Sequence, residues 1–490
     1  MTTIPQPLAP LRVLIIGAGF AGLGLAILLQ RAGIHNYLIL EKADEVGGTW
    51  RDNSYPGAAC DIHSHLYSFS FAPKNDWSRK FAPQSEILAY QRQLADEHGL
   101  RPHIRFGVEV VEAAFDEAAG VWQVTSDSGE LFTAQALVSA CGQLNRPAYP
   151  QLSGIEKFSG EVFHSARWNH AYDLSGKRVA VIGTGASAIQ FVPQIASQVA
   201  QLHLFQRSAA YVIAKPDRPY KAWELAVMRR FPAVQKLDRL LKYIQHESRA
   251  LAFSVFPSVM KVMRLEFQRH LRRGIGNPEL RKKLDPDYPL GCKRILISND
   301  YYPALARPNV EVISDPIREV TERGVITADG QEREVDAIIY GTGFAATGFL
   351  APMRISGRAG QTLDEVWQAG AEAYLGISVS GFPNLFLLYG PNTNLGHNSI
   401  LYMLESQFAY VLGCLRALDQ GLRYLDLKPE VQQRFNHKLQ HRIRHTVWAQ
   451  GCTSWYQTAD GKNTNNWPGF TLTYRHHTRH PEFVDYECIR

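Results

Sequence analysis

The stretch between residues 11 and 61 constrains the fold of this chain most strongly. A short apolar run there ends at a turn that contains Gly17, Gly19 and Gly22, and an apolar helical pattern follows the turn. A second apolar run ends on Glu41, about 20 residues beyond the glycines, which is the spacing of dinucleotide-binding units. We therefore expect a strand, a glycine turn, a helix and a strand that bind a dinucleotide, rather than a turn that merely packs against a helix.

The residue types in this unit suit a nucleotide. Glycines let the backbone approach a pyrophosphate closely, and the helix that follows presents its N-terminus to the phosphate groups. The carboxylate of Glu41 is expected to accept a hydrogen bond from a ribose hydroxyl. We expect the first nucleotide to contact Gly17, Gly19, Phe20, Gly22 and Glu41.

The residues after Glu41 carry a resemblance to a known family. Gly47-Gly48-Thr49-Trp50, Tyr55-Pro56-Gly57 and then Asp61 follow in order. This stretch resembles the flavin-contacting loop of the class B flavoprotein monooxygenases, the group of Baeyer–Villiger and related monooxygenases; the alternative is a glycine- and proline-rich surface loop. The resemblance implies that the first nucleotide is FAD. It implies FAD contacts at Gly48, Thr49, Trp50, Tyr55 and Asp61.

A second motif resembles the fingerprint of the Baeyer–Villiger monooxygenases. Phe158, Gly160, His164 and Trp168 have the spacing F-x-G-x-x-x-H-x-x-x-W. The family usually has Pro or Asp after the Trp, whereas this chain has Asn169, which puts membership of a subgroup in doubt. Trp168 favours the ketone-oxidising branch over relatives that oxidise nitrogen and sulfur. From the residues alone, His164 and Trp168 could equally be a packed pair in a linker.

A second dinucleotide unit begins at residue 178, where a strand pattern again leads into a glycine turn and a helix. Its next strand ends on Arg207 rather than on an acid. An acid would repel a 2′-phosphate, whereas a guanidinium can bind it, so we predict NADPH rather than NADH. The alternative is a solvated arginine. The expected contacts of this cofactor are Gly183, Thr184, Gly185, Ser187, Ala188, Arg207, Ser208 and Lys293.

Three segments of the C-terminal half are similar to parts of two-dinucleotide flavoproteins. They contain Gly343 in Gly-Thr-Gly-Phe, Asn392 in Gly-Pro-Asn-Thr and Trp455 in Ser-Trp-Tyr. The resemblance places Gly343 at a nucleotide contact, Asn392 beside the flavin ring and Trp455 near the nicotinamide.

The resulting fold expectation is α/β, with two dinucleotide-binding (Rossmann-like) domains, of which the FAD domain is interrupted by the NADP domain. A lysine- and arginine-rich stretch with helical periodicity is expected to be an insertion in the NADP domain. Its basic face is usually just solvated, and the alternative is contact with a membrane surface or a partner. The expected boundaries are 1–145 and 341–490 for the FAD domain, 146–214 and 288–340 for the NADP domain, and 215–287 for the insertion.

Two nucleotide sites, for FAD and NADPH, imply hydride transfer from the nicotinamide to the flavin. Reduction of a disulfide would need a reactive cysteine pair, and the sequence has no C-x-x-C, so oxygen is the expected acceptor and gives a flavin peroxide. To attack a ketone this peroxide must be an anion, and a buried anion needs a fixed cation nearby.

Arg294 is the candidate cation because it cannot lose its proton, and Asp61 is the candidate partner that orients it. Both positions match the catalytic pair of the resembled family, while Lys293 would help to hold the NADP phosphate; the alternative is a basic surface dipeptide. The resemblance implies NADPH- and O2-dependent Baeyer–Villiger oxidation of a ketone to an ester or lactone. Flavin-dependent S- or N-oxygenation, or an NADPH-consuming redox sensor, are the alternatives.

Length and composition fit this organisation. A chain of 490 residues is long enough for two or three domains, and 45% hydrophobic with 20% charged residues is ordinary for a soluble globular protein. A net charge of +6 suits an anionic cofactor but is too small to indicate a nucleic-acid partner. The six cysteines lack framework spacing, and residues 1–10 do not resemble a signal peptide, which predicts a cytoplasmic protein. No metal site is predicted, and no feature specifies an oligomeric state.

Overall fold

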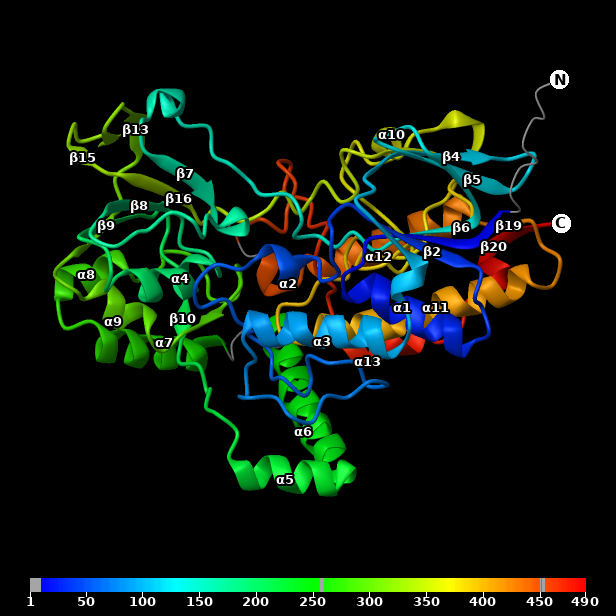
Figure 1. The fold of residues 1–490 in the computed structure, drawn as a ribbon, viewed down its shortest axis with the longest axis horizontal. Helices are drawn as coiled ribbons and strands as arrows, with labels where there is room; N and C mark the ends of the chain where they lie inside the picture. Colours follow the sequence, from blue (N-terminus) through cyan, green and yellow to red (C-terminus); the bar gives the residue numbers. More distant parts are fainter. Residues whose placement is uncertain (1–9, 256–259, 450, 452–453) are drawn as a thin grey trace.

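The computed structural model describes residues 10–255, 260–449, 451 and 454–490. Two sheets that contain parallel strands lie side by side, each with its own hydrophobic core and its own covering helices (Figure 1).

The first sheet begins with the unit expected from the N-terminal glycine turn. Its strands follow the order β17-β4-β5-β6-β1-β2-β3, and β18 pairs with β6. Strand β1 is a central strand, parallel to both β2 and β6. Its residues 13–16 are buried on both faces, because Val13 and Ile15 lie in one core cluster and Leu14 and Ile16 in another. The strands are β1 Leu11–Ile16, β2 Tyr37–Glu41, β3 Ile104–Phe106, β4 Val110–Asp116, β5 Val121–Ser126, β6 Leu131–Ser139, β17 Arg354–Ser356 and β18 Leu385–Leu387.

One predicted strand in this sheet is wrong. The pattern over residues 104–111 predicts a single strand, whereas the structure ends β3 at Phe106 and starts β4 at Val110. Gly107 lies between them with φ +70°, which turns the chain, so that β3 pairs with β2 while β4 pairs with β5.

Helices pack on the side of β1 that carries Val13 and Ile15, where they share one core with this strand. Helix α1 lies against α11, and both lie on the same side of the sheet as α3 (Figure 1). The helices of this domain are α1 Phe20–Arg31, α2 Thr49–Asp52, α3 Gln84–Glu97, α10 Leu363–Val366, α11 Ile400–Leu418, α12 Pro429–Ile443 and α13 Thr471–His477; a C-terminal pair of strands is β19 Tyr424–Leu427 with β20 Tyr486–Ile489.

The second sheet has the order β12-β9-β8-β16-β7, and all its strands are parallel. It is formed by β7 Glu161–His164, β8 Arg178–Ile182, β9 Gln201–Phe205, β12 Val310–Ile313 and β16 Ala337–Tyr340, with α4 Ala188–Ile195 after β8 and α9 Tyr301–Leu305 before β12. Beside it are an antiparallel sheet of β13 Ile317–Val320, β14 Gly324–Thr327 and β15 Glu332–Glu334, and a short pair of β10 Val212–Ile213 with β11 Leu296–Ile297.

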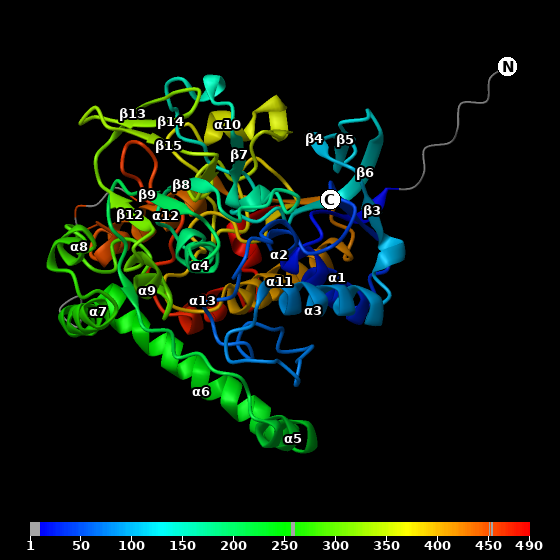
Figure 2. The same ribbon diagram turned by 60° about the vertical axis from the view of Figure 1, so that its left-hand side comes forward.

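The segment between β10 and β11 is helical, as predicted. It contains α5 Ala222–Arg230, α6 Pro232–Ala250, a π-helical turn Leu251–Val255, α7 Met260–Gly274 and α8 Pro278–Lys283. Helices α5 and α6 project from the body of the protein in both views (Figures 1 and 2). Among the described residues, no helix is both long and apolar enough to cross a membrane.

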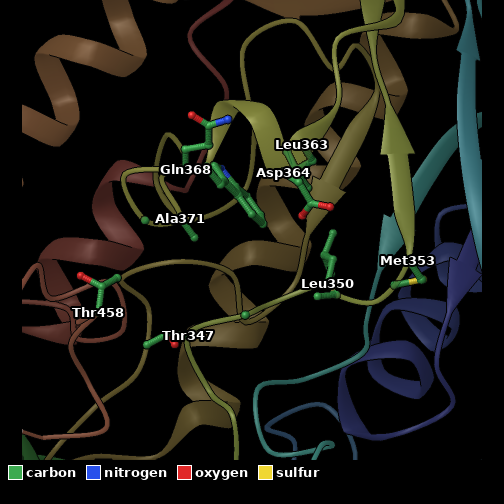
Figure 3. Close-up of a pocket in the computed structure, with 12 residues that line it drawn as sticks. Thr347, Leu350, Met353, Leu363, Asp364, Gln368, Ala371 and Thr458 are labelled. Atoms are coloured by element: carbon green, nitrogen blue, oxygen red, sulfur yellow. The ribbon is translucent and has the colours of Figure 1, made fainter. Parts of the chain in front are cut away.

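After β16 the chain returns to the first sheet, where β17 joins β4 and β18 joins β6. The predicted α/β fold, in which one dinucleotide-binding domain interrupts the other, is therefore confirmed. A cavity of about 230 Å³ lies beside α10 in this returning segment and is lined by Leu350, Trp367 and Thr458 among others (Figure 3).

Candidate active site

The first glycine turn leaves a space that suits a pyrophosphate. Gly17 has φ +106°, and a Cβ there would lie 2.8 Å from the carbonyl oxygen of Ala140, so the turn requires glycine. Gly19 has an ordinary extended backbone, and its Cβ would meet only the Cα of Gly48, at 3.7 Å. Gly19 thus lies close to Gly48 at the N-terminus of α1, where backbone N–H groups can bind phosphate.

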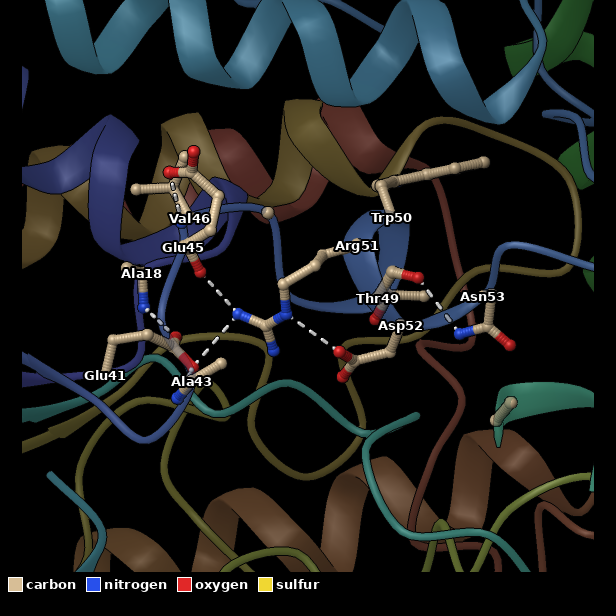
Figure 4. A network of polar contacts seen from close by, with 12 residues as sticks. Ala18, Glu41, Ala43, Glu45, Val46, Thr49, Trp50, Arg51, Asp52 and Asn53 are labelled. Carbon is tan, nitrogen blue, oxygen red and sulfur yellow. Dashed lines mark hydrogen bonds and ion pairs between the residues drawn. The ribbon is translucent and has the colours of Figure 1, made fainter. Parts of the chain in front are cut away.

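Glu41 fixes this turn to the end of β2. Its carboxylate accepts hydrogen bonds from the N–H groups of Ala18 (2.8 Å) and Ala43 (3.0 Å), and the side chain is buried (Figure 4). Arg51 compensates the buried charge by an ion pair at 3.1 Å and also donates to the carbonyl of Glu45 (Figure 4). Arg51 was missed by sequence reasoning, although it directly follows Trp50 of the flavin-loop motif.

The other residues expected to contact FAD lie in different environments. The Phe20 ring packs in the core against Tyr67, so its backbone rather than its side chain borders the turn. Trp50 donates from Nε1 to the Tyr67 hydroxyl (3.1 Å), and Thr49 is exposed. The hydroxyl of Tyr55 donates to Gln190 of α4 (3.0 Å), so this side chain joins the two domains.

The structure brings Asp61 and Arg294 together from positions far apart in the sequence. Arg294 donates from Nε (2.9 Å) and Nη2 (2.7 Å) to one oxygen, Oδ2 of Asp61, and from Nη1 to the carbonyl of Leu395 (3.2 Å). About a quarter of the Arg294 side chain and a third of the Asp61 side chain are exposed. The pair is therefore fixed on one side and open on the other.

The mutual attraction of Asp61 and Arg294 keeps both side chains ionised. The Asp61 carboxylate raises the pKa of Arg294 above its ordinary value, against the opposing effect of burial. Burial favours the neutral form of Asp61, but the charge and hydrogen bonds of Arg294 outweigh it and lower the pKa of the carboxyl. Lys215 adds a smaller effect in the same direction.

Buried polar atoms without partners lie on segments that approach this pair. Tyr456, whose pKa burial raises to about 12, is close enough for its hydroxyl to interact with the charge of Arg294. Within the described part of the chain, its hydroxyl has no hydrogen-bond partner, and the same holds for Oε1 of Gln143, Oδ1 of Asn392 and Nδ2 of Asn466. Buried polar groups are normally satisfied, so these atoms fit the polar edge of a flavin.

Asn392 also has a structural role. Its Nδ2 donates to the carbonyl of Asn463 (2.8 Å), which fastens the C-terminal segment to the loop after β18. Trp455 is 38% exposed and packs against Tyr456, with ring centroids 4.4 Å apart. Gly343 follows β16 with φ +80°, and a Cβ there would meet open space.

The second glycine turn repeats the first. Gly183 has φ +106°, and its Cβ would lie 2.5 Å from the carbonyl oxygen of Gly341. Gly185 is open, because its Cβ would have its nearest contact at 3.8 Å, to the same oxygen. Ser187 and Ala188 then begin α4, so the turn again leads into a helix N-terminus.

A cationic group lies at the end of β9. Lys293 donates to the Ser208 hydroxyl (3.1 Å), and Thr184 donates to the Ser208 carbonyl (3.2 Å). Burial and the neighbouring charge of Arg207 lower the pKa of Lys293. Two cations that repel each other next to a hydroxyl fit a phosphate dianion, which would relieve that repulsion.

The fingerprint segment packs the edge strand β7 onto α4. His164 is buried and accepts from the Ala166 N–H (3.0 Å), while Trp168 packs against Phe191. The unusual Asn169 accepts from the Ala171 N–H (3.0 Å), a turn that Asp can also make. The two side chains pack on different partners, His164 against Tyr149 and Phe344, and Trp168 against Phe163 and Phe191.

The spacing of the cysteines in the sequence did not predict a disulfide, but the structure contains one. Cys292, directly before Lys293, is disulfide-bonded, whereas the thiols of Cys60, Cys141, Cys414 and Cys488 are free. Cys452 lies outside the described residues.

Two nucleotide cradles and a fixed arginine–aspartate pair between them define a flavin- and nicotinamide-dependent oxidoreductase. The family model "Pyridine nucleotide-disulphide oxidoreductase" matches residues 14–236. A Baeyer–Villiger monooxygenase of Pseudomonas aeruginosa is 49% identical over 98% of this chain and 92% of its own length. The chain belongs to the Baeyer–Villiger monooxygenase family.

Solved structures agree with this assignment. Oxidized steroid monooxygenase bound to NADP is 32% identical, with a TM-score of 0.89 over 98% of this chain and 100% of that one. OTEMO in complex with FAD and NADP is 28% identical, with a TM-score of 0.88 over 98% and 100% of the two chains. The predicted family, enzyme class and cofactors, FAD and NADP, are confirmed.

Proposed function

We propose that this protein oxidises a ketone to an ester or lactone with NADPH and O2, and that Arg294 and Asp61 are the residues that promote this step. The observation that supports this most strongly is the Asp61–Arg294 pair, because it fixes a permanent cation beside the segment that follows the flavin-loop motif. When bound, FAD takes a hydride from NADPH and passes electrons to O2.

Arg294 is placed to stabilise negative charge. Its guanidinium cannot lose its proton, so it can hold positive charge against the oxygen that attacks the carbonyl and against the tetrahedral adduct. Asp61 positions the guanidinium through two bonds to a single oxygen. Because Lys293 is its neighbour and contacts Ser208, one short segment can bind the NADP phosphate and present Arg294 to the reaction.

The proposed reaction predicts a specific isotope result. We expect purified protein with NADPH and labelled O2 to insert one oxygen atom next to a ketone carbonyl, with one NADPH consumed per product. Mass spectrometry on a panel of cyclic, linear and aryl ketones, including a steroid ketone and cyclohexanone, would detect the label. NADPH oxidation without any oxygenated product across the panel would refute the proposal, as would products from sulfides alone.

The cationic group predicts cofactor choice. We expect Arg207→Ala to raise the Kd for NADPH by roughly 10–100-fold, the effect of losing one charged hydrogen bond, and to leave NADH affinity nearly unchanged. Arg323→Ala is a matched control, because Arg323 is a more exposed arginine of the same domain, far along the chain from β9. Equal use of both cofactors by the unaltered protein would contradict the assignment.

We also propose a cytoplasmic location. An enzyme that consumes NADPH at each turnover needs a compartment that regenerates it.

A further inference from the structure

The outer face of α6 is apolar, although a helix on a protein surface usually turns its apolar face inward. Apolar side chains recur there at spacings of three and four residues and remain exposed: Val234 is 38% exposed, Leu237 54%, Leu240 51%, Leu241 55% and Ile244 54%. An apolar stripe of this length on a soluble surface indicates an interaction site.

The polar face of α6 is the one that packs against the protein. Asp238 bonds to the ring of His65 (2.8 Å), and Arg239 donates to the backbone of the same segment. Glu247 accepts hydrogen bonds from Asn398 (2.7 Å) and from Thr471 (2.8 Å). These contacts with the FAD domain fix the helix with its apolar face outward, so the exposure of that face is built into the fold.

Helix α5 lies at the tip of the projection (Figure 2). Trp223 on α5 is 63% exposed, and Phe231 between the two helices is 53% exposed. We call this surface the outer strip. It consists of Trp223, Phe231, Val234, Leu237, Leu240, Leu241 and Ile244.

The exposed charges of the segment that carries the outer strip have one sign. Residues 221–250 are all described, and their acidic residues are engaged inside the protein, with Glu224 paired to Arg218 at 2.6 Å and Asp238 to His65. Every charged residue of this segment that is exposed is a lysine or an arginine. These residues are Lys221, Arg229, Arg230, Lys236 and Arg249.

We propose that the outer strip docks on the surface of a bilayer that contains anionic phospholipids. Tryptophan, phenylalanine and leucine side chains with lysine and arginine around them are the composition of a helix that lies in the membrane interface. A second copy of this chain fits less well, because a two-fold contact would bring cations against cations. An anionic surface is attracted by the same charges.

The test is flotation of the FAD-loaded protein with two kinds of vesicle: phosphatidylcholine alone, and phosphatidylcholine mixed with phosphatidylglycerol. We expect binding to the mixed vesicles, weaker binding to the neutral ones, and loss of the difference at high salt. Leu241→Gln/Ile244→Gln should reduce binding by at least about tenfold, because two apolar side chains no longer enter the interface. Ketone oxidation without vesicles should not change.

Val484→Gln is the matched control, because Val484 is an apolar residue that is 75% exposed but lies far from the outer strip. It should bind vesicles like the unaltered protein. Failure to bind mixed vesicles, or equal binding by the double variant, would overturn the proposal. So would a dimer in light scattering that Leu241→Gln/Ile244→Gln dissociates, since that result would assign the outer strip to a second copy.

Discussion

The Gly19→Val protein is expected to fold and to be colourless. Gly19 has φ −83° and ψ −166°, a conformation open to any residue, and a Cβ there would make only an ordinary contact at 3.7 Å. The fold can therefore accept a Cβ at this position, but the side chain then lies at the turn where the pyrophosphate is expected to bind. Loss of two or more charged hydrogen bonds to the pyrophosphate should weaken FAD binding by more than about 100-fold.

The second nucleotide site supplies the matched control. Gly185 is the equivalent open position, so Gly185→Val should stay yellow after gel filtration but lose rapid reduction by NADPH. Gly17 is unsuitable for this comparison, because its φ of +106° would strain any side chain and affect folding itself. Circular dichroism verifies the fold, and flavin absorbance reports the cofactor. Stoichiometric FAD in folded Gly19→Val protein would exclude this cradle as the FAD site.

Local patterns in the sequence were sufficient to predict the strands, glycine turns and helices of the two dinucleotide-binding units. Apolar runs that stop at glycines predicted β1 and β8 and the helices after them, because close backbone approach and positive φ at Gly17 and Gly183 admit no other residue. The residue at the end of β9 predicts NADPH, since the residue type at a strand end determines which phosphate it can accept. The cofactor is confirmed, whereas the role of Arg207 stays a prediction.

Contacts between distant segments could not be read in the same way. The pairing of Asp61 with Arg294 came from the family resemblance, because no local pattern relates residues so far apart. The contact of Tyr55 with Gln190 depends on how the two domains pack, which the motif around Tyr55 does not encode. Arg51 was missed because its role arises only when Glu41 is buried beside it.

Helix α6 illustrates a different limit. Its periodicity predicts a helix correctly, but periodicity alone suggests that the apolar face is buried. The opposite orientation results from polar partners on the FAD domain, among them His65 and Thr471, which satisfy the polar face. Which face of an amphipathic helix is buried thus depends on the surface that receives it.

The largest effect on the reaction itself is expected from Arg294→Ala, which should lower ester formation by about 10²–10³-fold or more while flavin reduction by NADPH continues. The oxygen that attacks a ketone carbonyl must carry negative charge, and Arg294 is the permanent cation that we propose to stabilise it. Sulfide oxidation uses the protonated form and gains little from a cation, so sulfoxide formation should fall much less. Asp61→Ala should act in the same direction but more mildly, because the cation remains and only its orientation is loosened.

Two further variants separate chemistry from folding. Arg294→Lys keeps the charge but cannot make both bonds to Oδ2 of Asp61, so it should retain more ester formation than Arg294→Ala. Arg294→Ala leaves the charge of the Asp61 carboxylate uncompensated, and the double variant Asp61→Asn/Arg294→Ala removes that charge. If the loss of ester formation in Arg294→Ala came from instability of the fold, the double variant would regain ester formation. Product formation from one ketone and one sulfide, with flavin reduction followed by stopped flow, measures all of these effects. Ester formation by Arg294→Ala at near the original rate would mean that this cation does not stabilise the attacking oxygen, since nothing else in the pair could replace its charge.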